Sequence, residues 1–177
     1  MPDTPRPALV SLLGVSGAGK TTLAAALVRH WTAAGRRVGY VKHASHGFDV
    51  DRPGKDTARL TEAGAAGVAV TGPGGVAYLE CGAPLTPETI VARWFADRDV
   101  VVLEGFRSHG HPAVVVVGAA PPLAAVREAR GPVLAVVAGP DGPDDATRSA
   151  AATAPVFLRD DVAGLAAHLD VALRLAR

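Results

Sequence analysis

Short apolar runs rich in valine and leucine alternate along this sequence with longer segments in which apolar residues recur every three or four positions. The runs have the length and composition of strands, and they cover residues 8–14, 36–43, 67–72, 76–81, 99–105, 113–118 and 133–139. The run at 99–105, DVVVLEG, is almost wholly apolar, which is typical of a strand buried on both faces of a parallel sheet. Only Pro73, Gly74 and Gly75 separate two of the runs, so these two are expected to be joined by a turn.

Helices are expected at residues 20–35, 56–64, 86–96 and 160–177. In the first of these helices, Leu23, Leu27 and Trp31 form one stripe and Gly35 supplies a C-terminal cap. The stripe of the last helix consists of Val162, Leu165, Ala166, Leu169 and Leu173. Residues 141–155 are rich in Pro, Gly and Ala, and we interpret them as a connector. Strands that alternate with helices predict an α/β fold, with a mostly parallel sheet flanked by helices.

The composition agrees with a globular protein and sets limits on its partners. The chain of 177 residues fits a single domain, 1–177, and its residues are 49% apolar and 20% charged. With a formal net charge of +1 and no block of like charges, we expect neither nucleic acid nor an acidic membrane as a partner. The first apolar run is too short to span a membrane and has no signal-peptide pattern, so a cytoplasmic location is expected. The lone Cys81 cannot form an internal disulfide.

The strongest chemical signal lies between the first predicted strand and the first predicted helix. Residues 14–21, GVSGAGKT, match the phosphate-binding pattern GxxxxGK[ST] in the structural context that this pattern requires. The glycines let backbone N–H groups surround phosphate oxygens, Lys20 reaches the terminal phosphates, and Thr21 offers a hydroxyl to Mg²⁺. We therefore predict a P-loop NTPase-type sheet and a nucleotide site formed by Gly14, Ser16, Gly17, Ala18, Gly19, Lys20, Thr21 and Thr22.

A magnesium site also needs a carboxylate, and Glu104 is the best candidate. It ends the apolar run at 99–105 and is followed by Gly105, so it is expected at the carboxyl end of a buried strand, where open α/β sheets bind their ligands. An ordinary surface residue at a strand end is the alternative interpretation.

The loop after the second predicted strand is denser in polar groups than a connector needs. Within it lie Lys42, His43, His46, Asp49, Asp51, Lys55 and Asp56. A loop that faces the phosphates and Mg²⁺ explains this composition best, with Asp51 as a second carboxylate near the metal. A transition-metal site at the histidines and a merely solvated loop are the alternatives. His109 and His111 could also contact a ligand or simply be exposed loop histidines.

Three stretches together resemble the molybdopterin-guanine dinucleotide biosynthesis adaptor protein family, MobB. They are GVSGAGKTTL, GYVKHASHGFDVDRPGKDTARLTEAGA and DVVVLEGFRSHGHP, which span about two thirds of the chain. The string DxPGKD[ST], here residues 51–57, and the EGF that ends the buried strand are more specific than the phosphate loop. The chain departs from the usual KHxHH of this family by carrying Ser45 before His46, which weakens a metal site there.

This resemblance implies a dimeric P-loop protein that binds GTP with Mg²⁺ and hydrolyses GTP slowly. Its partner would be the guanylyl transferase that joins GMP to molybdopterin, and whether molybdopterin itself contacts the second loop is left open. Catalytic roles would fall to Glu104 and Asp51. The chain lacks the guanine-reading string [NT]KxD, so Asp141, after the last long strand, is the one candidate for contacting the base.

Two other functions are compatible with the phosphate loop. A small-molecule kinase would need a mobile basic lid, for which Arg127 and Arg130 are candidates, although both residues equally suit a solvated turn. A structural module that has lost nucleotide chemistry is disfavoured, because Lys20 and Thr21 are both intact.

Overall fold

The computed structural model describes residues 6–44, 47, 55–118, 126–127, 129–139, 141–151 and 153–175. Its chain divides into two compact units, one made of Met1–His43 with Pro87–Arg177 and the other of Ala44–Thr86. That the whole chain, 1–177, forms a single domain remains a prediction.

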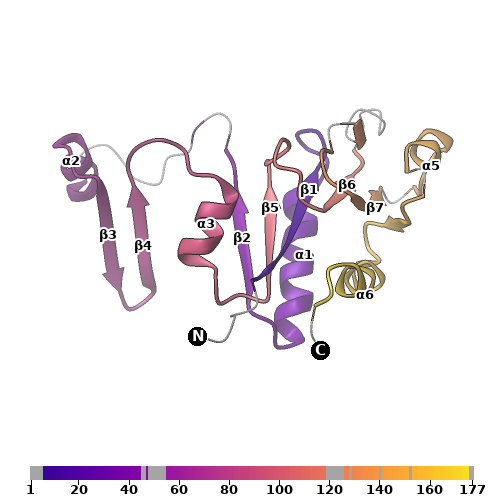
Figure 1. Ribbon diagram of the computed structural model, residues 1–177, viewed down its shortest axis with the longest axis horizontal. Helices are drawn as coiled ribbons and strands as arrows, with labels where there is room; N and C mark the ends of the chain where they lie inside the picture. Colours follow the sequence, from indigo (N-terminus) through magenta and orange to yellow (C-terminus); the bar gives the residue numbers. More distant parts are fainter. Residues whose placement is uncertain are drawn as a thin grey trace. The chain divides into compact units, whose positions relative to one another are not determined.

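Six strands form one parallel sheet in the larger unit, in the order β2-β5-β1-β6-β7-β8 (Figure 1). Their bounds are Ala8–Leu13 (β1), Val38–Lys42 (β2), Val100–Glu104 (β5), Ala113–Val116 (β6), Val133–Ala138 (β7) and Val156–Leu158 (β8). The chain runs from β1 to one edge of the sheet and later returns to β6 on the other side of β1. The topological switch point therefore lies beside β1, which is the place where open parallel sheets bind ligands. The predicted α/β sheet is confirmed.

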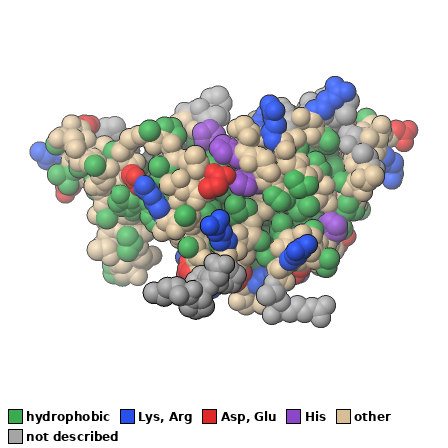
Figure 2. Space-filling view, in the orientation of Figure 1, with side chains coloured by type: hydrophobic (Ala, Val, Ile, Leu, Met, Phe, Trp, Pro, Cys, Tyr) green, Lys and Arg blue, Asp and Glu red, His purple; other side chains and the backbone are tan. Residues whose placement is uncertain are grey.

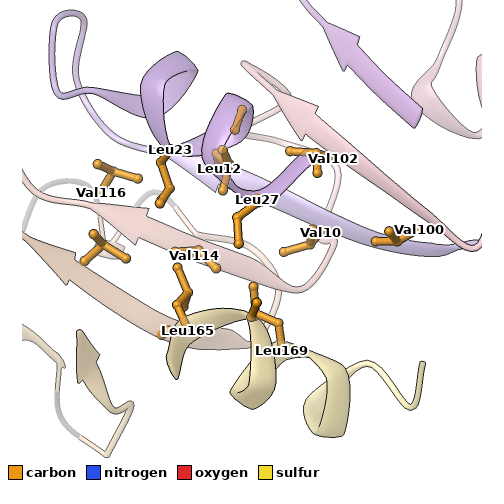
Figure 3. Close-up of a cluster of buried hydrophobic side chains, with 14 of the residues drawn as sticks. Val10, Leu12, Leu23, Leu27, Val100, Val102, Val114, Val116, Leu165 and Leu169 are labelled. Carbon is orange, nitrogen blue, oxygen red and sulfur yellow. The ribbon is translucent and has the colours of Figure 1, made fainter. Parts of the chain in front are cut away.

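Helices cover both faces of this sheet. On one face, α1 (Lys20–Ala33) and α6 (Val162–Ala172) pack against valines of the central strands (Figure 3). The predicted stripe of α1 is fully buried, since Leu23, Leu27 and Trp31 are each no more than 1% exposed. On the other face, α3 (Pro87–Trp94) and α5 (Asp145–Ala151) contribute to two further apolar clusters. Each face of the sheet thus has its own helical layer.

Polar contacts hold the end of α1 against α6. The Trp31 indole Nε1 and Arg36 Nη2 each donate a hydrogen bond of 2.9 Å to the carboxylate of Asp170 in α6. The side chain of Arg36 is only 13% exposed, so this ion pair is largely shielded from water. This anchor lies at the opposite end of α1 from the glycine-rich loop.

The C-terminal part of the sheet differs from the sequence-based expectation. Residues 141–155, interpreted as a connector, contain α5, and the strand β8 follows directly after them. The side chain of Asp144 accepts a hydrogen bond of 2.7 Å from the backbone N–H of Thr147, which caps the start of α5. With three residues, β8 is too short to give an alternating pattern in the sequence, and its place in the sheet comes from pairing with β7.

The smaller unit consists of α2 (Asp56–Glu62) and an antiparallel hairpin of β3 (Gly67–Gly72) and β4 (Gly75–Glu80). Gly72 pairs with Gly75 at the turn, as the sequence predicts. The ring of Tyr78 lies against Gly67, where a Cβ atom would come within 2.7 Å of its hydroxyl. Most side chains of the hairpin are exposed within this unit.

None of the helices in the part of the chain that the structure describes is long and apolar enough to cross a membrane.

Candidate functional site

The loop between β1 and α1 has the backbone shape of a phosphate-binding loop. Gly14, Gly17 and Gly19 all have positive φ angles, of 148°, 75° and 92°. At Gly14 a Cβ atom would collide with the carbonyl oxygen of Val116, so only glycine permits the loop to lie this close to β6. The loop ends at the N-terminus of α1, whose free N–H groups favour an anion.

Lys20 is the first residue of α1, and its side chain folds back over the loop. Its Nζ donates hydrogen bonds of 3.0 Å to the carbonyl of Gly14 and 2.7 Å to that of Val15. Burial and the nearby cations Arg107 and Lys42 lower the pKa of Lys20, whereas the negative charge of Glu104 raises it. The lowering effects are larger, so the pKa of Lys20 lies below its ordinary value. The ammonium group thus lies within the loop, where phosphate oxygens would replace backbone carbonyls as its acceptors.

Glu104 ends β5 and is 5% exposed, so the alternative of an ordinary surface residue is wrong. Its carboxylate accepts hydrogen bonds from the Thr21 hydroxyl at 3.0 Å and from the Tyr40 hydroxyl at 2.7 Å, and Lys42 Nζ lies 3.2 Å away. Burial alone would raise the pKa of Glu104, but the hydrogen bonds from these three side chains outweigh it and hold the pKa below its ordinary value. Glu104 is therefore a buried, ionised carboxylate next to the threonine of the phosphate loop.

These contacts fit a divalent cation. A carboxylate and a hydroxyl in contact at the end of the loop are the hard oxygen ligands that Mg²⁺ prefers beside a nucleotide. Thr21 and Glu104 would hold Mg²⁺ here, and the metal would supply positive charge to the phosphates.

Tyr40 and Lys42 belong to the site, although the sequence did not point to Tyr40. Both lie in β2, two positions apart and so on the same face of the strand, and Lys42 pairs with Glu104 in the register of β2 and β5. Burial and, after it, the hydrogen bond to Glu104 raise the pKa of Tyr40, so its hydroxyl remains a donor at neutral pH. The available signal in the sequence was that Tyr40 lies two positions before Lys42 and so on the same face of the strand. This spacing is common in strands and does not by itself mark a site.

Arg107 is a second residue that sequence reasoning missed. Three positions after Glu104, it donates a hydrogen bond of 3.3 Å from Nη2 to the carbonyl of Gly14. It is also close enough to lower the pKa of Lys20. Lys20 from α1 and Arg107 from the segment after β5 thus both donate to carbonyls of the loop.

The remaining predicted residues divide into three groups. Ser16 and Thr22 are exposed on the loop and the first turn of α1, whereas Ala18 is buried. Asp141 is exposed in a turn after β7, closed by a hydrogen bond of 3.1 Å from Gly142 N–H to the carbonyl of Gly139. Asp51, together with His46 and Asp49, lies outside the described residues, so its place near the metal stays a prediction.

A row of rings extends from the site. His43 and Phe106 have ring centroids 5.5 Å apart, as do Phe106 and His109, and the rings of His109 and His111 are stacked at 6.4 Å. Histidine side chains gather on the face drawn in Figure 2. His111 Nε2 lies 2.9 Å from a carboxylate oxygen of Glu88. Among the described residues no group of three histidine, cysteine or acidic side chains could hold a metal ion.

Comparison with known families decides which group of phosphate-loop proteins this is. The model of the family "Molybdopterin guanine dinucleotide synthesis protein B", MobB, matches residues 9–139. The chain belongs to the MobB family. The matched segment contains the glycine-rich loop, Tyr40, Glu104 and Arg107, and it ends before α5. The family resemblance read from the sequence is confirmed.

Curated relatives carry the same family name. The chain is 33% identical over 114 residues to a molybdopterin-guanine dinucleotide biosynthesis adapter protein of Haemophilus influenzae, covering 61% of this chain and 62% of that protein. It is 48% identical over 58 residues to the Escherichia coli adapter protein, covering 33% of each chain. The alignments thus span at most about two thirds of these relatives.

Solved structures match over nearly the whole chain. A crystal structure titled molybdopterin-guanine biosynthesis protein B has a TM-score of 0.68 at 28% identity and covers 94% of this chain and 99% of its own. Bacillus subtilis MobB, at 23% identity and a TM-score of 0.71, shares the fold over 96% of this chain and 98% of its own. The common fold thus covers more of the chain than residues 9–139, which the family model matches.

Proposed function

We propose that this chain is a GTP-binding adapter of molybdopterin guanine dinucleotide biosynthesis that hydrolyses GTP slowly and uses Mg²⁺. The observation that carries the proposal is the contact between Thr21 of the phosphate loop and the buried carboxylate of Glu104, in a chain of the MobB family. Lys20 binds the phosphates in this proposal, and Thr21 with Glu104 holds the metal. Asp51 is the proposed second carboxylate near the metal, and the cytoplasm is the proposed location.

Slow hydrolysis follows from the surroundings of Glu104. Its carboxylate already accepts bonds from Thr21 and Tyr40 and faces the ammonium of Lys42, so it is poorly placed to accept a proton from an attacking water. A depressed pKa makes it a weak base as well. These properties suit a group that holds a metal rather than one that activates a nucleophile.

Asp141 supports guanine as the base. It lies after β7, at the carboxyl end of the sheet that also carries the phosphate loop. Guanine presents two neighbouring N–H donors on its Watson–Crick edge, and an exposed carboxylate can accept from both, whereas adenine offers no such pair. We therefore assign the preference for GTP to Asp141.

Titration of the purified protein with GTP and with ATP, each with Mg²⁺, tests the proposal. GTP should bind at least about tenfold more tightly, since a carboxylate that accepts two hydrogen bonds contributes more than 1.4 kcal/mol. Asp141→Asn should remove most of this preference, and Asp145→Asn, which changes the same charge four positions away in α5, should keep it. Equal affinity of the wild type for the two nucleotides would contradict the guanine assignment.

The same preparation distinguishes the adapter from a small-molecule kinase. An adapter should bind the guanylyl transferase of the pathway in a pull-down assay and release phosphate from GTP in only a few turnovers per hour or less. Arg127 and Arg130, the candidate lid of a kinase, are exposed. Rapid transfer of the terminal phosphate to a metabolite would overturn the adapter function.

We also propose that the chain is a homodimer, and the hairpin of the smaller unit supports this. Val70, Val76 and Tyr78 are 51%, 74% and 52% exposed, and a two-stranded hairpin alone buries too little to be stable. A second copy would cover these side chains and offer strand edges for pairing.

Val76→Lys should convert the dimer into a monomer in sedimentation velocity. Val171→Lys, which changes a 79% exposed valine on α6, should leave it dimeric.

A further inference from the structure

Arg159 connects the C-terminal part of the chain to the phosphate loop. It follows β8 directly, 20 residues beyond the end of the segment that matches the family model. Its Nη2 donates a hydrogen bond of 2.8 Å to the carbonyl of Ala18 in the loop and one of 3.1 Å to the carbonyl of Val117 after β6. One guanidinium nitrogen thus ties three segments of the larger unit together.

The guanidinium group lies tightly against the loop. A Cβ atom on Gly19 would come within 2.7 Å of Arg159 Nη1, so a side chain at position 19 would displace the arginine. Gly118 makes a similar close approach, because a Cβ there would lie 2.9 Å from the Cα of Ala18. Arg159 Nε is buried and makes no hydrogen bond with the described residues. The chain thus keeps a partly desolvated cation at this position at an energetic cost.

The bond to Ala18 has a direct consequence for anion binding. The carbonyl of Ala18 and the N–H of Gly19 belong to one planar trans peptide unit, in which C=O and N–H point in opposite directions. Because Arg159 holds the carbonyl, the N–H of Gly19 points to the opposite side of the peptide, away from this donor. A charged donor on the carbonyl also polarises the peptide and makes this N–H a stronger donor.

We propose that Arg159 is a positioning residue for the phosphate site, which orients and polarises the peptide between Ala18 and Gly19 so that the Gly19 N–H binds phosphate. This inference rests on the phosphate-binding part of the proposed function and is independent of the base. Arg159 acts through the loop and not by contact with the nucleotide.

Isothermal titration of Arg159→Ala with two probes, inorganic pyrophosphate and GDP, each with Mg²⁺, tests the inference. Both affinities should fall by the same factor, about tenfold or more, because the Gly19 N–H that Arg159 orients binds the phosphate that both probes carry. Arg159→Lys should recover part of the loss, and millimolar guanidinium chloride should restore affinity to Arg159→Ala. A merely structural arginine would show neither recovery.

Arg36→Ala is the matched control. Arg36 is also partly buried and paired with one carboxylate, but it lies beyond the far end of α1, roughly 20 Å along the helix from the loop. It should lower the melting temperature and leave both affinities unchanged.

The outcomes separate this inference from the proposed function. If folded Arg159→Ala binds both probes as well as the wild type, the inference is wrong, but the proposed function is unaffected. The same holds if Arg159→Ala loses affinity for GDP but not for pyrophosphate, because Arg159 would then contact the nucleoside. A wild type that binds pyrophosphate but no guanine nucleotide would contradict GTP binding and leave the inference standing. A wild type that binds neither probe would overturn both.

Discussion

Lys20→Ala should lower the affinity for GTP about a hundredfold while the protein remains folded. An ammonium that donates charge-assisted hydrogen bonds to phosphate oxygens contributes about 3 kcal/mol, which corresponds to this factor. In the structure the same ammonium donates hydrogen bonds to the carbonyls of Gly14 and Val15, which belong to the loop and not to the apolar core. The melting temperature should therefore fall by no more than about 4 °C, or about 1 kcal/mol for a domain of this size.

Arg29→Ala is the control for this result. It removes a positive charge from an exposed position of the same helix, α1, without touching the loop. Its GTP affinity should match that of the wild type. This result would show that the loss in Lys20→Ala comes from a local contact and not from a general loss of positive charge. If Lys20→Ala bound GTP as well as the wild type, the loop would not be a phosphate site.

The pH dependence of binding gives a second readout of Lys20. Its pKa in the free protein lies below the ordinary 10.5, and bound phosphates raise it because they favour the charged amine. Affinity should thus be constant below the pKa of the free protein and fall as the pH rises above it. A titration series from about pH 7 to about pH 10 should show this fall in the wild type and a smaller one in Lys20→Ala.

The sequence predicts the parallel sheet and the phosphate loop because both depend on local signals. The apolar run that ends at Glu104 marks a strand buried on both faces, and apolar runs in the sequence cover five of the six strands of the sheet. The loop is specified by glycines that must adopt positive φ angles and by a lysine at a fixed spacing. Local patterns of this kind do not require knowledge of the tertiary structure.

The rest of the site depends on contacts between distant segments. Arg159 donates to the carbonyl of Ala18, 141 residues away, and follows a strand of only three residues. Tyr40 reaches Glu104 across 64 residues, through the pairing of β2 with β5. In the sequence, neither residue differs from an ordinary arginine or strand tyrosine. Their roles follow from the order of the strands, which places the ends of β2, β5, β6 and β8 around one loop.

Glu104→Gln should make GTP binding nearly independent of Mg²⁺ and lower GTP hydrolysis about a hundredfold. The substitution keeps the shape of the side chain but removes the negative charge of the buried carboxylate beside Thr21. A carboxylate at the end of the phosphate loop contributes to binding through the metal, so affinity measured in EDTA should be almost unchanged.

Two further variants show whether this effect comes from the charge of Glu104 itself. Tyr40→Phe removes one hydrogen bond to the carboxylate and keeps its charge, so it should weaken the Mg²⁺ dependence only about threefold. Asp97→Asn removes a negative charge before the amino end of β5, the end opposite Glu104, and should have no effect. Equal losses of GTP affinity in Mg²⁺ and in EDTA for Glu104→Gln would mean that Glu104 only stabilises the fold.

The Mg²⁺ dependence of the wild type should also change with pH. Because the hydrogen bonds hold the pKa of Glu104 below its ordinary value, the wild type should keep its Mg²⁺ dependence throughout the neutral range. It should lose this dependence only in acid, as the carboxylate becomes protonated.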